Sequence, residues 1–283
     1  MKPTVTASTQ SFTIPNNTMQ SKQSILSSKA LIATMNTGAW RATKLHKDET
    51  AKVNIQHHAD DVARVSVTIT AHSALEGINK LHAKARQDHY RITLPCGDEG
   101  WRFLPCGREM EHSDMMLAYR SEHDRLVNEF MADYANEKAT APQRLNGLYR
   151  PEFFPPEDEV RARFKFATRY LPVPDKGTWQ DWLREAAEEA EEDLRTRLRD
   201  TLNAAASRLG KPDAIFRDSL IGNIAEICEL APDLNLTDAH DIRIVAESAH
   251  AELADLDPDT LRQNPDVRSV AAERAARLAS LLV

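Results

Sequence analysis

Residues 178–209 constrain the fold of this 283-residue chain more than any other segment. Apolar side chains recur along them at the three- and four-residue spacing that lines one face of an α-helix. Gly210 and Pro212 follow and would end such a helix. At 1.5 Å per residue the helix would be about 48 Å long, which is typical of coiled coils. Its apolar face consists of Trp182, Leu183, Ala186, Ala187, Ala190, Leu194, Leu198, Leu202, Ala205 and Leu209.

Charge on this predicted helix is ordered along its length. Acidic side chains come first and basic ones follow, which suits the helix dipole. A run of acids is most often a solvated helix face. The alternative is a docking surface for a basic partner, formed by Trp182, Glu188, Glu189, Glu192 and Leu194. An apolar face left exposed on this helix would indicate an interface.

The rest of the C-terminal third predicts a helical bundle. Three more helical patterns follow the long one, at 213–230, 239–254 and 265–283. The loops between them are short and marked by Pro, which favours antiparallel packing of neighbouring helices.

The middle of the chain mixes strand and helix signals. Residues 65–70 alternate β-branched and polar side chains, which is a strand pattern. Short strands at 90–94 and 101–104 flank a loop with Gly and Pro, and predict a hairpin. The other elements expected here are helices at 73–88 and 109–136 and an edge strand at 164–171, closed by Pro172 and Pro174.

Together these patterns predict an α+β protein dominated by helix. A small antiparallel or mixed sheet would pack on helices, ahead of a long central helix and a C-terminal helical bundle. Residues 1–38 hold 13 Ser and Thr, three Lys and neither Asp nor Glu, and their apolar surface is too small to offset the entropy of ordering. We therefore expect a disordered leader at 1–38, an α+β domain at 39–175 and a helical domain at 176–283.

The net charge of -7 conceals an asymmetry. Residues 1–110 hold 14 Lys and Arg against 9 Asp and Glu, whereas residues 111–283 hold 22 against 34. Phosphates would be repelled by the acidic part, so a nucleic-acid surface would lie before residue 110. A folded surface of mixed charge is the ordinary interpretation of the basic part. Base stacking and phosphate contact would instead use the cations and tryptophan at 80–108, namely Lys80, Lys84, Arg86, Arg91, Trp101, Arg102 and Arg108.

Motifs give little support to catalysis. The sequence lacks the phosphate-binding loops, zinc-protease motif, serine-hydrolase elbow and calcium loop that would announce an enzyme or a metal protein. Cys96, Cys106 and Cys228 form neither a disulfide framework nor a zinc pattern, and they fit a reducing cytosol. We expect no cofactor and no metal. A metal-dependent nuclease built from scattered acids and histidines is the weakest alternative.

Histidines are expected on solvated surfaces. His57 and His58 are adjacent, so their side chains point apart and seldom chelate together. His112 and His123 share one face of the 109–136 helix but would lie about 16 Å apart, too far for one metal ion. A solvated helix face is therefore the expectation for both.

Several strings in the chain resemble a family of unknown function from phages and mobile elements. The resemblance covers about residues 36–283 and leaves the leader outside. The family carries an apolar or small residue where Cys96 and Cys106 stand here, which weakens the case for thiol chemistry. The strings are Trp40-Arg41-Ala42-Thr43-Lys44, Thr93-Leu94-Pro95, Gly100-Trp101-Arg102-Phe103-Leu104-Pro105, Leu145-Asn146-Gly147-Leu148-Tyr149, Phe164-Lys165-Phe166, Tyr170-Leu171-Pro172-Val173-Pro174 and Phe216-Arg217-Asp218-Ser219-Leu220-Ile221-Gly222-Asn223.

The resemblance implies partners but no chemistry. Genes of this family lie beside a MoxR-type AAA+ ATPase of the CobS kind and a von Willebrand A-domain protein of the CobT kind. The resemblance thus implies an adaptor, a third and non-enzymatic component of an ATPase-driven remodelling system in the cytoplasm of a bacterial host cell. It assigns no catalytic residue. A nucleic-acid-binding accessory protein that uses residues 80–108 remains the alternative, and self-association remains open.

Overall fold

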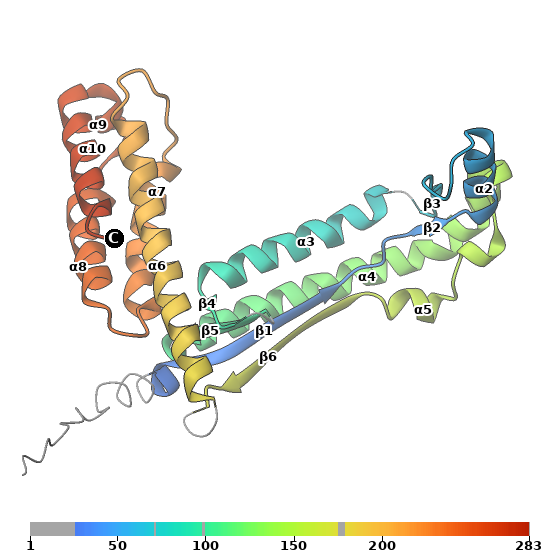
Figure 1. Ribbon diagram of the computed structural model, residues 1–283, viewed down its shortest axis with the longest axis horizontal. Coiled ribbons are helices and arrows are strands. Elements are labelled where there is room, and N and C mark those ends of the chain that lie inside the picture. Colours follow the sequence, from blue (N-terminus) through green and yellow to red (C-terminus); the bar gives the residue numbers. More distant parts are fainter. Residues whose placement is uncertain (1–25, 71, 98–99, 175–178, 283) are drawn as a thin grey trace, which may run out of the picture.

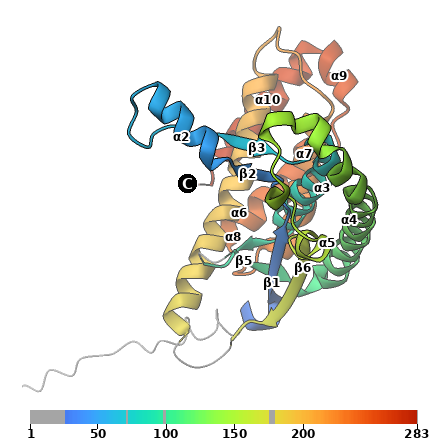
Figure 2. The same cartoon turned by 90° about the vertical axis from the view of Figure 1, so that its right-hand side faces the viewer.

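Figure 1 shows the computed structural model, which describes residues 26–70, 72–97, 100–174 and 179–282. An elongated arm, residues 26–174, meets an upright helical bundle, residues 180–282, near the foot of helix α6 (Figure 1). The view turned by 90° shows α6 running the height of the bundle beside the sheet of the arm (Figure 2). No helix in the described parts of the chain combines the length and apolar character needed to cross a bilayer.

The arm contains the sheet and two long helices. Short 3₁₀ turns at Cys106–Arg108, Asn146–Leu148 and Pro151–Phe153 connect some of its elements. In chain order the elements are β1 (Ala30–Gly38), β2 (Thr43–Leu45), α2 (Lys47–Gln56), β3 (Ser66–Thr68), α3 (His72–Arg91), β4 (Leu94–Pro95), β5 (Trp101–Pro105), α4 (Glu109–Leu145), α5 (Glu157–Arg161) and β6 (Lys165–Pro172).

All regular elements in the described part of the bundle are helical. Its elements are α6 (Gln180–Leu209), α7 (Ser219–Leu234), α8 (His240–Ala249), a π-helical turn (His250–Ala254), α9 (Pro258–Gln263) and α10 (Pro265–Ala279). The predicted fold class is confirmed: the chain is predominantly helical, with a small antiparallel sheet, a long helix and a C-terminal bundle.

The sheet has β1 near its centre. Its four strands are antiparallel in the order β4-β5-β1-β6, so the predicted edge position of β6 is confirmed. Ile32 of β1 pairs with Phe103 of β5 on one side and with Leu171 of β6 on the other. The short strands β2 and β3 form a separate ribbon.

The expected disordered leader is wrong for its final part. Residues 26–29 are helical and Ala30–Gly38 form β1. Leu26, Ala30 and Ile32 are buried. The apolar surface that covers them comes from β4, β5 and α6, which lie far along the chain, so the composition of residues 1–38 alone does not reveal it. The remainder of that prediction, residues 1–25, lies outside the described residues.

The hairpin is confirmed, but its first strand is shorter than expected. Helix α3 continues to Arg91, so the first two residues of the strand predicted at 90–94 are helical, and only Leu94 and Pro95 pair with β5. Gly97 then turns the chain with a φ of +76°. A Cβ atom at Gly97 would lie 3.0 Å from the indole nitrogen of Trp182, so both the backbone and the packing require glycine there.

The two faces of the sheet have different neighbours. Paired residues of antiparallel strands share a face, and alternate residues along a strand point the same way. Phe166 and Tyr170 of β6 contact histidines of α3 and α4, so one face is covered by these helices. We call the opposite face, which carries Ile32 and Phe103, the outer face.

Helix α6 covers only part of the outer face. Ile32 and Phe103 belong to the same buried cluster as Leu183 and Ala186 of α6, so the arm and the bundle share one core. Lys165, at the beginning of β6, pairs with Gly38 on the same outer face and is exposed. The outer face is therefore covered near the bundle and open further along the arm.

The apolar face of α6 is buried within this chain. It packs against α7 and α10, and the buried positions are Leu183, Ala186, Ala190, Leu194, Leu198, Leu202, Ala205 and Leu209. The predicted long helix is confirmed. Its apolar face supplies the bundle core and leaves no exposed stripe.

Arg268 of α10 closes the C-terminal end of α6. Its guanidinium is buried and donates hydrogen bonds to the carbonyls of Arg208, Leu209, Lys211, Pro212 and Ala214. These include carbonyls that the end of a helix leaves without a partner. One side chain thus replaces several missing backbone hydrogen bonds.

Replacing Arg268 by Met should therefore destabilise the protein strongly. The side chain keeps much of its volume, but buried carbonyls lose their donors, at about 1–3 kcal/mol for each group left unsatisfied. We expect a loss of about 3 kcal/mol or more in the free energy of unfolding, measured by chemical denaturation. Arg274→Met is the control, because Arg274 lies on the same helix and is half exposed, with one long ion pair to Glu252. Equal stability of the two variants would contradict the capping role.

Candidate functional site

Two histidine pairs lie between α3 and α4. His82 Nε2 is 2.9 Å from His123 Nδ1, and His89 Nδ1 is 2.8 Å from His112 Nε2. All four side chains are buried. The prediction that His112 and His123 lie on a solvated face is therefore wrong: both face α3 and provide the polar part of a helix–helix contact.

The sheet closes this histidine layer from the other side. The ring of Phe166 lies 6.0 Å from that of His82 and 5.8 Å from that of His123, measured between centroids. Tyr170 extends the second pair, because its hydroxyl lies 2.8 Å from His112 Nδ1. Each histidine pair is thus enclosed by α3, α4 and β6.

The contacts favour one proton arrangement for the second pair. His89 Nε2 is buried and has no hydrogen-bond partner among the described residues. A protonated Nε2 would be a buried donor with no acceptor, which is rarer than an unused acceptor. We therefore assign His89 Nδ1–H as donor to His112 Nε2, and His112 Nδ1–H as donor to the hydroxyl oxygen of Tyr170.

Burial keeps these imidazoles neutral. It lowers the pKa of His82 to about 4, that of His89 to about 3 and that of His112 to about 4. The pKa of His123 is lowered for the same reason. Neutral pairs can hydrogen-bond without an unpaired buried charge, so the arrangement suits a structural contact near neutral pH.

The described residues contain no cluster of three or more His, Cys, Asp or Glu side chains placed to hold a metal ion. The thiols are also poorly suited to nucleophilic chemistry. Burial raises the pKa of Cys96 to about 12 and that of Cys228 to about 11, so both remain protonated near neutral pH. Cys228 borders a pocket of about 500 Å³ between α7 and α8, which also contacts Arg243 and His250.

The residues predicted for partner docking on α6 lie in three different environments. Leu194 is fully buried in the bundle and offers no surface to a partner. Trp182 is partly buried, with its ring 5.9 Å from that of Trp101 and edge-on to it. Glu188 and Glu189 are exposed.

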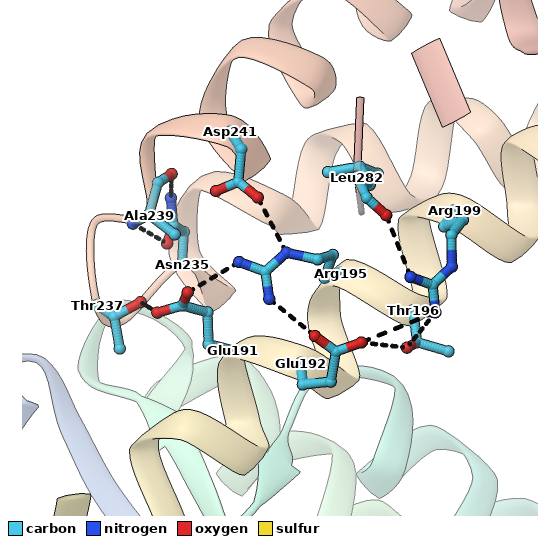
Figure 3. Close-up of polar contacts among 10 residues, drawn as sticks. All are labelled: Glu191, Glu192, Arg195, Thr196, Arg199, Asn235, Thr237, Ala239, Asp241 and Leu282. Carbon is cyan, nitrogen blue, oxygen red and sulfur yellow. Dashed lines mark hydrogen bonds and ion pairs between the residues drawn. The ribbon is translucent and has the colours of Figure 1, made fainter. Parts of the chain in front are cut away.

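Glu192 belongs to an ion-pair network that fastens α6 to the rest of the bundle (Figure 3). Arg195 donates to Glu191, Glu192 and Asp241 at 2.9 Å each, and its hydrogen bonds, above all that to Asp241, raise its pKa. Arg199 adds a hydrogen bond to the carbonyl of Leu282 near the C-terminus. The carboxylate of Glu192 is therefore already engaged within the chain.

The same network fixes the loop between α7 and α8. The hydroxyl of Thr237 donates to Glu191 at 2.6 Å, and Asn235 makes two hydrogen bonds with the backbone of Ala239 (Figure 3). The carboxylates in the middle of α6 thus hold the bundle together.

Trp179 is the exposed aromatic that the sequence analysis missed. Its ring lies 5.8 Å from that of Trp182, and 49% of its surface is accessible. Trp101, Trp182 and Trp179 therefore form a chain from the sheet to the surface. The signal in the sequence was its spacing of three residues before Trp182, on the same side of the helix.

The cations at 80–108 do not form one surface. Lys80 pairs with Glu76 on α3, Lys84 is exposed, and Arg86 donates to Thr37. Arg91 and Arg108 pair with Glu226 and Asp233 of α7 and so connect the arm to the bundle.

Arg102 is engaged within the arm. Its guanidinium lies 4.4 Å from the centroid of the Tyr90 ring and donates to the hydroxyl and the carbonyl of Thr93. Burial lowers its pKa to about 10, which still leaves it charged near neutral pH. Five of the six predicted cations thus make contacts inside the molecule, and Lys84 makes none within the described residues.

No protein-family model, curated protein or solved structure matches this chain. The resemblance to the phage and mobile-element family consequently stays a prediction.

The histidine pairs predict a specific loss of stability in acid. Their pKa values are lowered by folding, so between about pH 6.5 and about pH 4 the unfolded chain binds protons that the folded chain does not. The free energy of unfolding should fall as the pH falls through this range, by up to about 1.4 kcal/mol per pH unit for each histidine.

Thermal unfolding from pH 7 to pH 4.5 would measure this slope. The variant His82→Gln/His123→Gln should show a shallower dependence than the wild type, because two of the four groups are gone. His57→Gln/His58→Gln removes two exposed histidines and should keep the wild-type slope. Parallel curves for all three proteins would show that the buried pairs do not control acid stability.

Proposed function

We propose that this chain is a non-enzymatic interaction protein that docks a basic protein partner on the first turns of α6. The surface in question, which we call the α6 docking face, consists of Trp179, Trp182, Glu185, Glu188 and Glu189. The observations that carry the proposal are the half-exposed Trp179 at the N-terminal end of α6 and the exposed carboxylates on the turns that follow it. The resemblance suggests the partner: the MoxR-type AAA+ ATPase or its von Willebrand A-domain companion.

Charge on the docking face favours a basic partner. Residues 180–283 hold 12 Lys and Arg against 22 Asp and Glu, whereas residues 26–174 hold 21 against 20. The negative charge of the chain is therefore concentrated in the bundle. Such a surface speeds the approach of positively charged partners and repels acidic ones.

Two carboxylates on this face are available for a partner. Glu185 and Glu188 are exposed and make no ion pair or hydrogen bond within the described parts of the chain. Further along α6, Glu192 and Asp193 are already paired with Arg195 and Arg197. Docking at the first turns would therefore leave the network in Figure 3 undisturbed.

Trp179 suits the role of an interface anchor. Tryptophan is enriched among the few residues that dominate binding energy in protein interfaces. Trp182 supports its ring from one side, and Trp182 itself rests on Trp101 and Gly97. A partner would meet an aromatic side chain that is already supported, which lowers the entropy cost of binding.

The alternative of a nucleic-acid-binding accessory acting through residues 80–108 gains less support. Arg91, Arg102 and Arg108 would have to give up contacts within the chain to bind phosphate. The remaining lysines, Lys80 and Lys84, make a small part of the predicted surface.

Affinity co-purification of the tagged protein from its host cells tests the proposal. With nuclease present, we expect an AAA+ ATPase or its von Willebrand A-domain companion to be recovered with the wild type. Trp179→Ala/Glu188→Lys should reduce that recovery by about tenfold or more, because an interface anchor is worth about 2 kcal/mol.

The matched control is Glu229→Lys/Glu273→Lys, which changes two exposed carboxylates elsewhere on the bundle. It should keep the partner, since general acidity of the bundle is not enough for docking. Failure to recover either protein with any nucleotide, or full recovery with the α6 variant, would refute the proposal.

A further inference from the structure

Five cations gather on the open part of the sheet and the loop beside it. They are Arg41 and Lys44, from the segment that follows β1, Arg163 before β6, and Lys165 and Arg169 on β6. We call them the basic cluster. Nothing in the sequence pattern assigned any of them to a binding surface, although Arg41, Lys44 and Lys165 occur in strings that resemble the phage and mobile-element family. They belong neither to the 80–108 segment nor to the α6 docking face.

The basic cluster borders a pocket of about 670 Å³. Arg41, Lys44, Arg163 and Lys165 line it together with small and polar residues such as Asn36 and Gly38, and none of the lining residues is acidic. No Asp or Glu occurs at 30–46 or at 160–172 either. The positive potential of this hollow is therefore not cancelled by carboxylates on the two segments that build it.

The five side chains are free of competing partners. None of them makes a hydrogen bond or an ion pair within the described residues. Arg91, Arg108 and Arg195 show the contrast, since each is held by carboxylates of another element or of its own helix. Binding an anion at the basic cluster would break no existing ion pair.

The backbone under the cluster is held in place. Trp40 is buried, and its ring lies edge-on to that of Tyr134 at 5.6 Å. The carbonyl of Ala42 accepts a hydrogen bond from the amide of Ile69 at 2.7 Å. The loop that carries Arg41 is thus fastened on both sides, and binding would cost little ordering of the main chain.

The arrangement is elongated. Lys165 and Arg169 share the outer face because they are four residues apart on one strand, and this spacing corresponds to about 13 Å. Ala167 lies between these two cations on β6, and Gly38 lies opposite Lys165 on β1. These small residues do not obstruct access to the two cations. A row of this length matches about four base pairs of a duplex at 3.4 Å of axial rise per pair, whereas a single phosphate could meet only part of it.

We infer that the basic cluster binds the phosphate backbone of a nucleic acid along the open outer face of the sheet. The cations contact successive phosphates and make no base-specific contact, so binding is independent of sequence and sensitive to salt. The acidic bundle at the other end of the sheet repels the nucleic acid, so the nucleic acid would bind at the end of the arm that is far from the bundle. This inference does not depend on the α6 docking face.

Fluorescence anisotropy with a short labelled single strand and the matching duplex tests the inference. The full chain should bind at least one of the two probes, and the tighter one identifies the form that fits the face. Affinity should fall steeply between about 50 and 200 mM salt. Arg163→Glu/Lys165→Glu should lower the affinity by about tenfold or more and reduce the slope of the salt dependence by about two.

Two variants with the same change in charge serve as controls. Lys211→Glu/Arg217→Glu alters two exposed cations in a loop of the bundle, and Lys80→Glu/Lys84→Glu alters two on α3. Both should keep the wild-type affinity within about a factor of three, and circular dichroism should show that all variants fold. Absence of binding by the wild type at low salt would overturn the inference. So would an equal loss in either control.

Discussion

The contact between α3 and α4 decides which side of the sheet is covered. Its centre is polar: two neutral histidine pairs replace the apolar side chains that usually fill a helix–helix contact. Burying four imidazoles is costly unless they are hydrogen-bonded. The pairs meet this requirement largely among themselves, with Phe166 and Tyr170 of β6 closing the layer. Both helices are thereby held on one face of the sheet.

The outer face of the sheet is buried in one part and exposed in the other. Near the bundle it is covered by α6, and Ile32 and Phe103 enter the core that α6 shares with α7 and α10. Beyond α6 it stays open and carries Lys165 and Arg169. The exposed carboxylates and the basic cluster therefore lie apart. The carboxylates lie on the first turns of α6, and the cations lie on the part of the sheet that is far from the bundle. The two proposed partners would therefore bind at different places.

Local patterns in the sequence predicted the elements that depend on local spacing. The apolar repeat at 178–209 predicted α6, and the Pro-marked loops predicted the bundle. Strand β1 was missed because its burial depends on β4, β5 and α6, which lie far along the chain. The short helix α9 was also missed: at six residues it has too few turns for a periodic signal.

The candidate sites were harder to predict because they depend on tertiary contacts. His82 and His89 continue the buried stripe of Leu75, Ile78 and Ala85, so the spacing on α3 did contain a signal for burial. That signal could not show which residues of α4 they meet. The basic cluster arises only when β1 pairs with β6, which brings residues 36–44 beside 162–169. By contrast, the cations at 80–108 are close in sequence but point to different neighbours.

Neutral histidine pairs fasten α3 and α4 to the sheet. The most direct measurement is an NMR titration of the imidazole nitrogens in the folded, ¹⁵N-labelled protein between about pH 7 and pH 5, within the range where an ordinary histidine titrates. We predict that His82, His89 and His112 keep the chemical shifts of neutral imidazoles throughout this range. Titration of these three buried histidines near pH 6.5 would contradict a buried layer of neutral histidines.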